Sequence, residues 1–471
     1  MPASQSAKPA SPQTATTQAV AEPGALPEGG APASGKTLFA ERARRRRELM
    51  RAMGPSAVAV IPAAPPRTRN RDVDYPHRQD SDFFYLTGFT EPEALLVLVP
   101  GREQGESIIF CRERDRQREI WDGRRVGVEQ APQLVGVDHA FPIGDADDIL
   151  PGLLEGRDKL YYPMGREVEF DARVIQWVNR VKEKVRGGVH APREMISLEF
   201  HLHEMRLIKS REELRQMRRA GRLSAQGHIR AMQVCRPGLR EYQLEAELSY
   251  VFGRDGCGHA YSPIVGGGDN GCILHYTENS EELRDGDLVL IDAGAEYAGY
   301  AGDITRTFPV NGRFSEAQRE IYQLVLRAQL AAIDEVRPGQ HWDAPHTAAV
   351  RALTAGLVDL GLLQGEVDQL IEDGTYRKYY MHRTGHWLGM DVHDVGEYKV
   401  DGQWRELEPG MVLTIEPGLY IASDSDAPEQ YRGIGVRIED DVAVTRDGCE
   451  VLSADVPKDI DAIEALVGSA R

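Results

Sequence analysis

The sequence predicts an α/β protein with two folded domains. Its 471 residues are too many for one ordinary core. In the first part of the chain, short runs of strand-forming residues alternate with helical stretches. The second part contains amphipathic helices followed by strands that end on acidic side chains. A hydrophobic content of 41% is typical of a globular protein.

The composition argues against several classes of partner. The 56 Lys and Arg residues and 74 Asp and Glu residues leave a net charge of −18, which repels nucleic acid and anionic lipid. No apolar run approaches the roughly 18 residues that suggest a membrane span. Five cysteines without C-x-x-C spacing are typical of reduced thiols in a cytosolic enzyme. We therefore expect a cytoplasmic protein with no nucleic-acid partner and no membrane partner.

Residues 1–36 are predicted to form a disordered tail, because they are rich in Ala, Pro, Ser, Thr and Gly and contain few charges. They lack the basic start and apolar middle of a signal peptide and the arginines of a mitochondrial presequence. The basic run Glu41–Arg51 follows. Its apolar neighbours predict a helix with one packed side, and we expect the arginines on a solvated face.

Residues 37–205 are predicted to form the smaller α/β domain. Strands are expected in the segments AVAVIP, DFFYLTGF, ALLVLVP and SIIFCR, and helices near 126–135 and 171–186. No metal-binding or nucleophile cluster is visible in this region. Polar and aromatic loop residues such as Asp72, Arg78 and Trp121 are interpreted as structural when the region is considered alone.

Residues 206–471 are predicted to form the second domain. A capping box at Ser210 predicts a helix to about Gln233, and a second one at Ser315 predicts a helix to about Val336. Further helices are expected at 241–254 and 345–361. The order helix, helix, then strands with acidic or histidine residues occurs twice, which indicates an internal duplication.

Two acids frame a glycine-rich turn in this second domain. Asp292 ends the apolar strand Leu288–Ile291, and Asp303 opens the return strand. Acids at facing strand ends repel each other unless a cation or a shared proton lies between them. Asp beside Gly is also common turn chemistry, and this stretch alone favours the turn interpretation.

Further candidates lie towards the C-terminus. The segment MHRTGHWLGMDVHD brings three histidines together, and Glu416 and Glu439 follow apolar strands as Asp292 does. Four carboxylates and an imidazole without a thiolate suit two divalent ions such as Mn²⁺, with Zn²⁺, Co²⁺ or Fe²⁺ as alternatives. The three histidines of the segment are His382, His386 and His393.

Two other motifs fail in their context. The segment GGGDNG satisfies G-x-G-x-x-G, but it runs into CILHYTEN, a strand-like stretch, where a dinucleotide site requires a helix. The pattern H-E-x-x-H begins at His203 and then has Leu207 in place of the second histidine. Neither a nucleotide site nor a zincin site is predicted.

The candidate residues, in their order and contexts, resemble a known family. The segments IDAGAEYAGYAGDITRTF, HRTGHWLGMDVHD, TIEPGLY and GIGVRIEDD resemble the metallopeptidases of the pita-bread fold. The segments ILHYTEN and RNRDVDYPHRQDSDFFYLTGFTEPEALLVL are similar to aminopeptidase P. The resemblance covers residues from about 38 to the C-terminus. It implies an α+β second domain with an internal pseudo-twofold repeat.

The resemblance also implies roles for individual residues. One ion would be held by Asp292, Asp303 and Glu439, and the other by Asp303, His386, Glu416 and Glu439. Glu416 would also carry protons. His275 and His393 would orient the scissile carbonyl, His382 would line the proline pocket, and Arg437 would balance the acids or contact substrate.

The implied function is hydrolysis of the N-terminal Xaa-Pro bond of peptides by a water molecule that two metal ions activate. The implied assembly is a homodimer or homotetramer, in which Trp121 and Asp72 reach a neighbour's site. A prolidase restricted to dipeptides is the alternative within the family. A non-catalytic binding module on the same fold would be expected to have lost metal ligands, and all five are present here.

Overall fold

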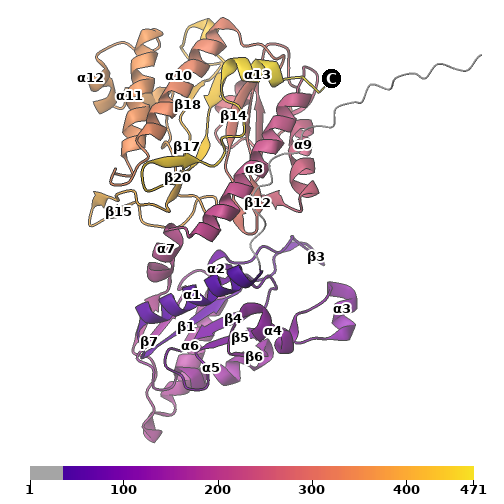
Figure 1. The fold of residues 1–471 in the computed structure, drawn as a ribbon, viewed down its shortest axis with the longest axis vertical. Helices are drawn as coiled ribbons and strands as arrows, with labels where there is room; N and C mark the ends of the chain where they lie inside the picture. Colours follow the sequence, from indigo (N-terminus) through magenta and orange to yellow (C-terminus); the bar gives the residue numbers. More distant parts are fainter. Residues whose placement is uncertain (1–34, 471) are drawn as a thin grey trace, which may run out of the picture.

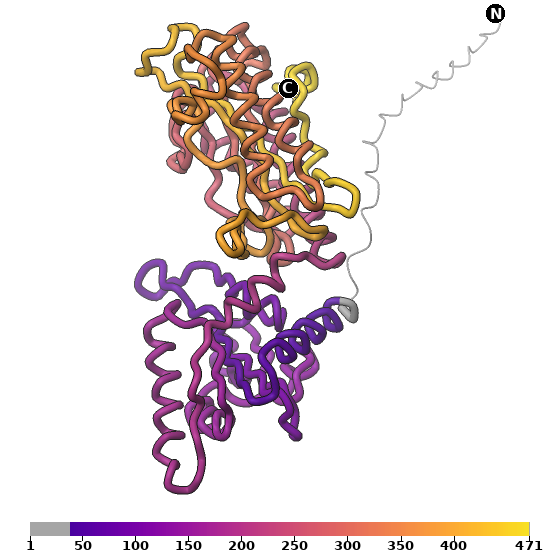
Figure 2. The backbone as a smooth tube through the Cα atoms, turned by 90° about the vertical axis from the view of Figure 1, so that its left-hand side faces the viewer, coloured from indigo at the N-terminus to yellow at the C-terminus, as the bar shows by residue number. Residues whose placement is uncertain are grey.

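The computed structural model describes residues 35–470, which form two bodies joined by one helix (Figures 1 and 2). The disorder predicted for residues 1–36 lies outside the described residues, except for Gly35 and Lys36. These two residues begin helix α1 (Gly35–Met53). No described helix combines the length and the apolar character needed to cross a membrane.

The N-terminal domain is built on a six-stranded sheet with the order β6-β5-β4-β1-β7-β8. β1, β4 and β5 pair antiparallel, and the remaining pairs are parallel. The strands are β1 (Ala57–Pro62), β4 (Leu95–Leu98), β5 (Ser107–Cys111), β6 (His139–Pro142), β7 (Lys159–Tyr162) and β8 (Glu194–Ser197). The short pair β2 (Thr68–Asn70) and β3 (Val73–Asp74) lies outside this sheet.

Helices cover both faces of the sheet, which explains why its central strands β1 and β4 are apolar throughout. In β1, Ala57, Ala59 and Ile61 face a core shared with α1, α2 and α4, and Val58 and Val60 face a core shared with α5 and α6. The helices are α2 (Ser81–Thr87), α3 (Arg116–Asp122), α4 (Gly127–Val135), α5 (Ala146–Leu154) and α6 (Val168–Lys182).

The strand predicted for the segment DFFYLTGF is wrong, because the segment forms helix α2. The Asp80 side chain accepts a hydrogen bond from the backbone N–H of Phe83 at 2.9 Å, and Gly88 ends the helix with φ 64°. An N-cap and a left-handed glycine therefore outweigh the strand preference of the aromatic residues.

The basic run does form the predicted helix, but two of its arginines are buried, so the expected solvated face is wrong for them. Arg46 donates to the carbonyl oxygen of Leu86 at 2.6 Å, at the end of α2. Arg45 donates to the Tyr85 carbonyl oxygen at 3.0 Å and lies 3.2 Å from Glu213 of the other domain. Guanidinium groups here satisfy carbonyls at a helix C-terminus.

The C-terminal domain repeats the predicted order of two helices followed by strands. The first half contains α8 (Arg211–Val234) and α9 (Glu241–Arg254), and the second contains α10 (Glu316–Asp334) and α11 (Ala344–Asp359). Capping boxes at Ser210 and Ser315 start α8 and α10, as predicted. Two shorter helices, α12 (Val367–Glu372) and α13 (Ile460–Leu466), also belong to this domain. Helix α7 (Glu199–Leu207) connects it to the N-terminal domain.

The strands of this domain lie between the helix pairs (Figure 1). The first half has an antiparallel sheet β10-β11-β14, and the second has the sheets β17-β20-β21 and β18-β19. Their bounds are β10 (Ile264–Gly267), β11 (Leu288–Asp292), β14 (Thr305–Pro309), β17 (Val412–Ile415), β18 (Gly418–Ile421), β19 (Ile434–Arg437), β20 (Asp440–Val444) and β21 (Cys449–Val451). The short strands are β9 (Gly258–His259), β12 (Ala295–Tyr297), β13 (Tyr300–Ala301), β15 (Lys399–Val400) and β16 (Gln403–Trp404).

The strand-like interpretation of CILHYTEN is also wrong. The segment begins in a 3₁₀ turn (Gly268–Cys272) and continues as an irregular loop. Asn279, at φ 46°, fixes the end of the loop: its side chain accepts from Val265 N at 2.9 Å and donates to Glu245 at 2.9 Å. Hydrogen bonds to α9 and β10 therefore hold this loop in place of the backbone hydrogen bonds that a strand would make.

An apolar cluster and a charged cluster join the two domains. The apolar cluster packs Leu49 and Phe83 of the N-terminal domain with Leu388 and Leu452 of the C-terminal domain. In the charged cluster, Arg206 of α7 lies 2.7 Å from Asp82, 2.7 Å from Asp391 and 2.6 Å from Asp394. The boundary predicted between residues 205 and 206 falls within α7 and stays a prediction.

Arg206→Met should lower the free energy of unfolding by about 3–5 kcal/mol at pH 7, because it leaves the buried Asp82 and Asp394 without their shared cation. Urea titration of the full chain measures the change. The matched control is Arg218→Met, which removes a half-exposed pair with Glu450 and should cost less than about 1 kcal/mol.

The destabilisation by Arg206→Met should also shrink in acid. Burial raises the pKa of Asp82 and of Asp394, but a hydrogen bond with His203 and the neighbouring arginines outweigh it at Asp82, and Lys209 and Arg206 outweigh it at Asp394, so both pKa values are lowered. The stabilising effect of these neighbours is therefore complete above the ordinary aspartate pKa of about 3.9 and is lost as the pH falls through the lowered values. Equal losses for the two arginine variants, or a loss that does not change below about pH 4, would contradict this account.

Candidate active site

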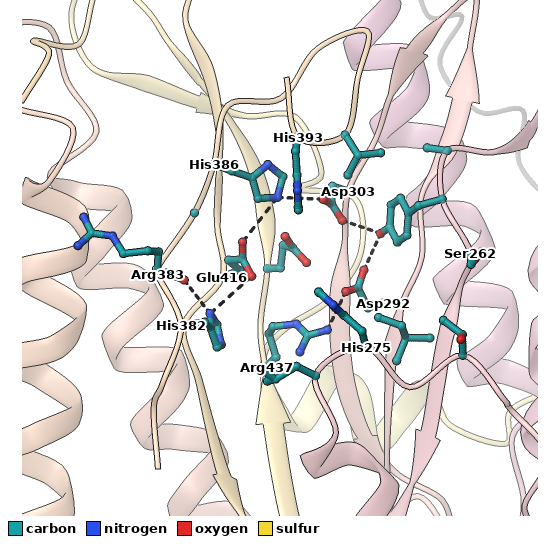
Figure 3. Close-up of a pocket in the computed structure, with 18 residues that line it drawn as sticks. Ser262, His275, Asp292, Asp303, His382, Arg383, His386, His393, Glu416 and Arg437 are labelled. Atoms are coloured by element: carbon teal, nitrogen blue, oxygen red, sulfur yellow. Dashed lines mark hydrogen bonds and ion pairs between the residues drawn. The ribbon is translucent and has the colours of Figure 1, made fainter. Parts of the chain in front are cut away.

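The nine residues predicted from the sequence line one cavity of about 740 Å³ in the C-terminal domain (Figure 3). Residues from both halves of the domain contribute to its wall. They are His275, Asp292, Asp303, His382, His386, His393, Glu416, Arg437 and Glu439. Their individual roles stay predictions, but the structure brings all of them together.

The four acids converge because four strand ends meet. Asp292 is the last residue of β11, Asp303 lies two residues before β14, Glu416 lies between β17 and β18, and Glu439 directly precedes β20. The Glu439 backbone N–H donates to the Thr305 carbonyl at 3.1 Å, which joins the two halves at this point. The backbone of the paired strands therefore places the four acids close together.

Two glycines permit backbone contacts that a side chain would block. A Cβ at Gly294 would lie 1.6 Å from the carbonyl oxygen of Gly302, and a Cβ at Gly385 would lie 1.9 Å from that of Thr414. The first contact closes the turn between Asp292 and Asp303. The second places His386 against β17.

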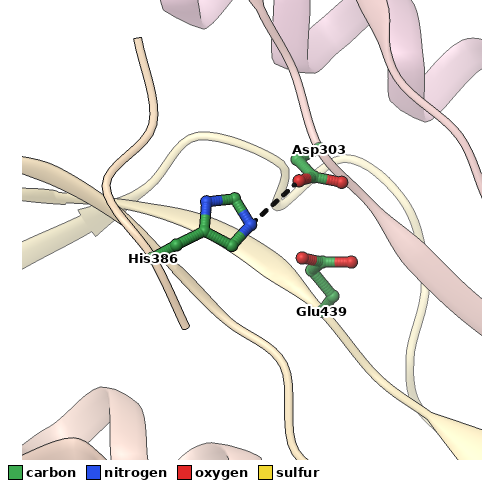
Figure 4. A group of neighbouring side chains, drawn as sticks. All are labelled: Asp303, His386 and Glu439. Atoms are coloured by element: carbon green, nitrogen blue, oxygen red, sulfur yellow. Dashed lines mark ion pairs between the residues drawn. The ribbon is translucent and has the colours of Figure 1, made fainter. Parts of the chain in front are cut away.

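Three of the side chains form a compact group of potential ligands. One ligand atom each from Asp303, His386 and Glu439 lies within 4.8 Å of the other two (Figure 4). His386 Nε2 is 3.4 Å from Asp303 Oδ2 and 3.6 Å from Glu416 Oε1. The Tyr261 hydroxyl lies 2.6 Å from Asp292 Oδ1 and 2.5 Å from Asp303 Oδ1, so it links the two aspartates.

The backbone orients the His386 ring. Nδ1 lies 3.0 Å from the Trp387 carbonyl oxygen, which can only accept, so Nδ1 bears the hydrogen and Nε2 faces the acids. Thr414 accepts from the His386 backbone N–H at 3.1 Å and donates to Glu416 Oε1 at 3.2 Å. One threonine hydroxyl thus positions both residues.

The cavity holds more negative charge than its cations balance. Burial is the largest cause that raises the pKa of Glu439 and of Asp292, and it raises the pKa of Glu416 to about 7; neighbouring carboxylates add to each shift. Burial lowers the pKa of His386, but Asp303 and Glu416 outweigh it and raise the value to about 9. Such mutual repulsion is what a bound cation relieves.

The donor set fits a hard divalent cation. It is rich in carboxylate oxygen and has one imidazole, and none of the described residues lining the cavity is a cysteine. Arg437 offsets part of the charge by donating to Asp292 Oδ2 at 2.7 Å. The chemistry of the residues therefore agrees with a metal centre.

A chain of hydrogen bonds leads from Arg437 to His382. Arg437 Nη1 donates to the Tyr420 hydroxyl at 3.0 Å, and this hydroxyl lies 2.8 Å from His382 Nε2. His382 Nδ1 lies 2.7 Å from the Arg383 carbonyl, so Nδ1 donates and Nε2 accepts from Tyr420. Burial and then Arg437 lower the pKa of His382 to about 3, which keeps the ring neutral.

The two remaining histidines are carried on loops. The His393 ring packs edge-on against His386, with 4.2 Å between ring centroids. The loop bearing His275 is held by the fully buried Glu241 of α9, which accepts from Gly267 N at 2.8 Å and from the Tyr276 hydroxyl at 2.8 Å. A buried carboxylate thus serves as the anchor of this loop.

Sequence reasoning missed five residues that hold the site together. Thr305 and Thr414 lie in strands β14 and β17, where threonine is common, and Tyr420 and Asp441 lie unmarked inside the family motifs. Nothing around Tyr261 in the sequence marked it. The Thr305 hydroxyl donates to Glu439 at 2.5 Å, and the Asp441 carboxylate accepts from Asp303 N at 3.1 Å.

The two residues with an implied role at a neighbour's site do not line the cavity. Trp121 lies on α3, with 85% of its surface exposed. Asp72 is exposed at the turn between β2 and β3. Their roles stay predictions.

Models of two protein families match the chain. Residues 215–446 match metallopeptidase family M24, and residues 42–161 match the N-terminal domain of aminopeptidase P. The Xaa-Pro aminopeptidase of Escherichia coli is 51% identical over 430 residues, which are 91% of this chain and 97% of that protein. The family suggested by the sequence motifs is thereby confirmed.

Solved structures agree with the fold. The aminopeptidase PepP of Pseudomonas aeruginosa has 58% identity and a TM-score of 0.91, with 92% of this chain and 98% of that chain covered. Zinc-substituted aminopeptidase P of E. coli, in complex with product, has 51% identity and a TM-score of 0.89, with 92% and 99% covered. The predicted fold class, a smaller α/β domain followed by a pita-bread domain, is confirmed.

Gly385→Ala should weaken binding of Mn²⁺ at least about tenfold, because the new Cβ separates His386 from Thr414. Calorimetric titration of metal-free protein measures the affinity. Gly253→Ala is the control, since a Cβ at this helical position meets nothing within 4 Å. An unchanged affinity in Gly385→Ala would show that the close contact is not needed.

Proposed function

This chain belongs to metallopeptidase family M24 and is a Xaa-Pro aminopeptidase, and we propose that its active site is the cavity lined by the nine predicted residues. The enzyme removes the N-terminal residue from peptides that have proline in second position. One observation carries the proposal: four strand-end carboxylates, two of them buried and two partly buried, converge with one imidazole where the acids repel one another.

We propose that the site binds two divalent ions and that Mn²⁺ is the preferred metal, because the donors are mostly carboxylate oxygens. Asp303 and Glu439 would be shared between the ions, and their closeness to His386 supports this. When bound, the ions supply Lewis-acid chemistry that activates a water molecule and polarises the scissile carbonyl. Asp292 would bind one ion only, and His386 and Glu416 the other.

Proton transfer would fall to Glu416. Peptide hydrolysis must move a proton from the attacking water to the proline nitrogen, and a carboxylate beside both the water and the substrate can do this. Glu416 Oε1 lies near His386 Nε2, and Glu416 Oε2 lies 3.9 Å from His382 Nδ1, on the side proposed for proline. This position between the ligand group and the proline pocket supports the assignment.

The histidines and Arg437 would bind and orient the peptide. His393 and His275 line the cavity and would donate hydrogen bonds to the oxygen on which charge develops. His382, kept neutral and fixed by Tyr420, would pack against the proline ring. Arg437 is tied to Asp292 and Tyr420, so it would hold these two in place as well as balance charge.

We propose a homodimer or homotetramer in which the N-terminal domain supports assembly. Ile120 and Trp121 on α3 are 80% and 85% exposed, and exposed apolar pairs of this size favour a protein contact. Trp121, with Asp72, would then border the cavity of a neighbouring subunit.

We also propose a cytoplasmic location, where the five free cysteines would stay reduced.

Metal-free protein should not hydrolyse Gly-Pro-Ala, and Mn²⁺ should restore hydrolysis. Asp303→Asn should lower kcat by at least about 10²-fold while leaving the circular dichroism spectrum unchanged, because an amide cannot serve as a shared anionic ligand. Asp368→Asn is the control, since this acid forms only a surface pair with Arg351. Full activity after chelation would refute the metal mechanism, and cleavage of Gly-Pro but not Gly-Pro-Ala would indicate a prolidase.

Trp121→Ala should lower kcat/KM for Gly-Pro-Ala by about tenfold through loss of a contact at the neighbour's site. Mixing the Trp121→Ala protein with the Asp303→Asn protein should then recover activity. In a mixed oligomer, the Trp121→Ala subunit supplies an intact metal site and its Asp303→Asn neighbour supplies an intact Trp121. Leu134→Ala on α4, another exposed apolar side chain, should change neither measurement. No recovery on subunit exchange would contradict the shared site.

A further inference from the structure

The loop that carries His393 is bound on its outer side by the N-terminal domain and α7. We call residues 387–394 the histidine loop; it has no helix or strand of its own. Val392 and His393 line the cavity, and Figure 3 shows His393 pointing towards Asp303. Asp391 and Asp394, on either side of them, interact with residues outside the cavity.

Asp391 connects the loop to α2. Its carboxylate accepts from the Ser81 hydroxyl at 2.6 Å and from Arg206 Nη2 at 2.7 Å. Arg78 donates to the Met390 carbonyl oxygen at 2.6 Å and to the Ser81 hydroxyl at 3.1 Å. Backbone and side chain of the loop are thus both held by a segment more than 300 residues earlier in the chain.

Asp394 connects the loop to α7 and to the start of α8. Its side chain is 1% exposed and accepts from Arg206 Nη2 at 2.6 Å and from Lys209 Nζ at 2.9 Å. A Cβ at Gly389 would lie 2.1 Å from Asp394 Oδ2, so the loop folds tightly around this carboxylate. Arg206 also bonds Asp82 of α2 at 2.7 Å, which makes it common to both loop acids and the N-terminal domain.

The arrangement does more than join two domains. Buried ion pairs add little net stability, so stability alone does not account for a cluster of this kind. Charge-assisted hydrogen bonds at 2.6–2.9 Å do fix orientation, and they are placed directly beside His393. A loop without secondary structure needs such support to hold a side chain in one position.

We propose that Ser81, Arg78 and Arg206 are positioning residues, through which the N-terminal domain orients His393 in the active site of its own subunit. The inference rests on the proposed function, because it requires His393 to contact the reacting carbonyl. Loss of these contacts would let the loop move by a fraction of an ångström to an ångström, and displacements of this size can cost about 10²-fold in rate.

Ser81→Ala and Asp391→Asn test the proposal without removing the buried Arg206. Each should lower kcat for Gly-Pro-Ala by about tenfold, with little change in KM or in the unfolding midpoint, because the peptide still binds while the catalytic donor is misplaced. The matched control is Ser423→Ala, which removes a serine-to-aspartate hydrogen bond of 2.8 Å outside the cavity. It should leave kcat unchanged.

A double-mutant cycle shows whether the effect passes through His393. In a His393→Ala background, Ser81→Ala should lower kcat no further, because the residue that it positions is gone. An equal loss in both backgrounds would overturn the proposal, and so would a normal kcat with a lowered unfolding midpoint in Ser81→Ala. Absence of Xaa-Pro hydrolysis in the unsubstituted, Mn²⁺-loaded protein would instead refute the proposed function.

Discussion

Repulsion among carboxylates that are wholly or partly buried is the constraint on which the C-terminal domain depends. Asp292, Asp303, Glu416 and Glu439 line one cavity, and burial strengthens the interaction between like charges. The neighbours of these acids are arranged to contain that repulsion: Arg437 and Tyr261 hydrogen-bond Asp292, and His386 faces Asp303. A divalent cation would neutralise this oxygen-rich group of acids more completely than any one of these side chains does.

The consecutive residues Glu439 and Asp440 show the two ways in which this fold accommodates a buried acid. Asp440 faces away from the cavity, where Arg306 and Lys458 lie 2.7 Å and 2.6 Å away and, against burial, lower its pKa to about 2. Glu439 faces the cavity and its acidic neighbours, and its pKa is raised. Because successive side chains of an extended segment point to opposite sides, the structural acid Asp440 and the cavity acid Glu439 can be neighbours in the sequence.

Features that depend on local pattern could be predicted from the sequence. Capping boxes located α8 and α10, and acids at the ends of apolar strands marked Asp292, Glu416 and Glu439 as candidates, because both signals need only a few neighbouring residues. The roles of His275, His393 and Arg437 came from the resemblance to a known family. Prediction failed where tertiary partners decide. The burial of Arg45 depends on Glu213 of the other domain, and the role of Tyr261 depends on Asp292 and Asp303, which lie 31 and 42 residues away in the chain. Helix α2 is a different case, because its Asp80 cap and its terminal Gly88 are local signals that the strand preference of the aromatic residues obscured.

The apolar cluster between the domains limits how this protein can be divided. Leu388, Val412 and Leu452 of the C-terminal domain share one core with Leu49 and Phe83 of the N-terminal domain. A C-terminal fragment made alone would present these side chains to water and would tend to aggregate. The two domains are thus not interchangeable modules, and recombination between homologues would have to exchange both sides of this core together.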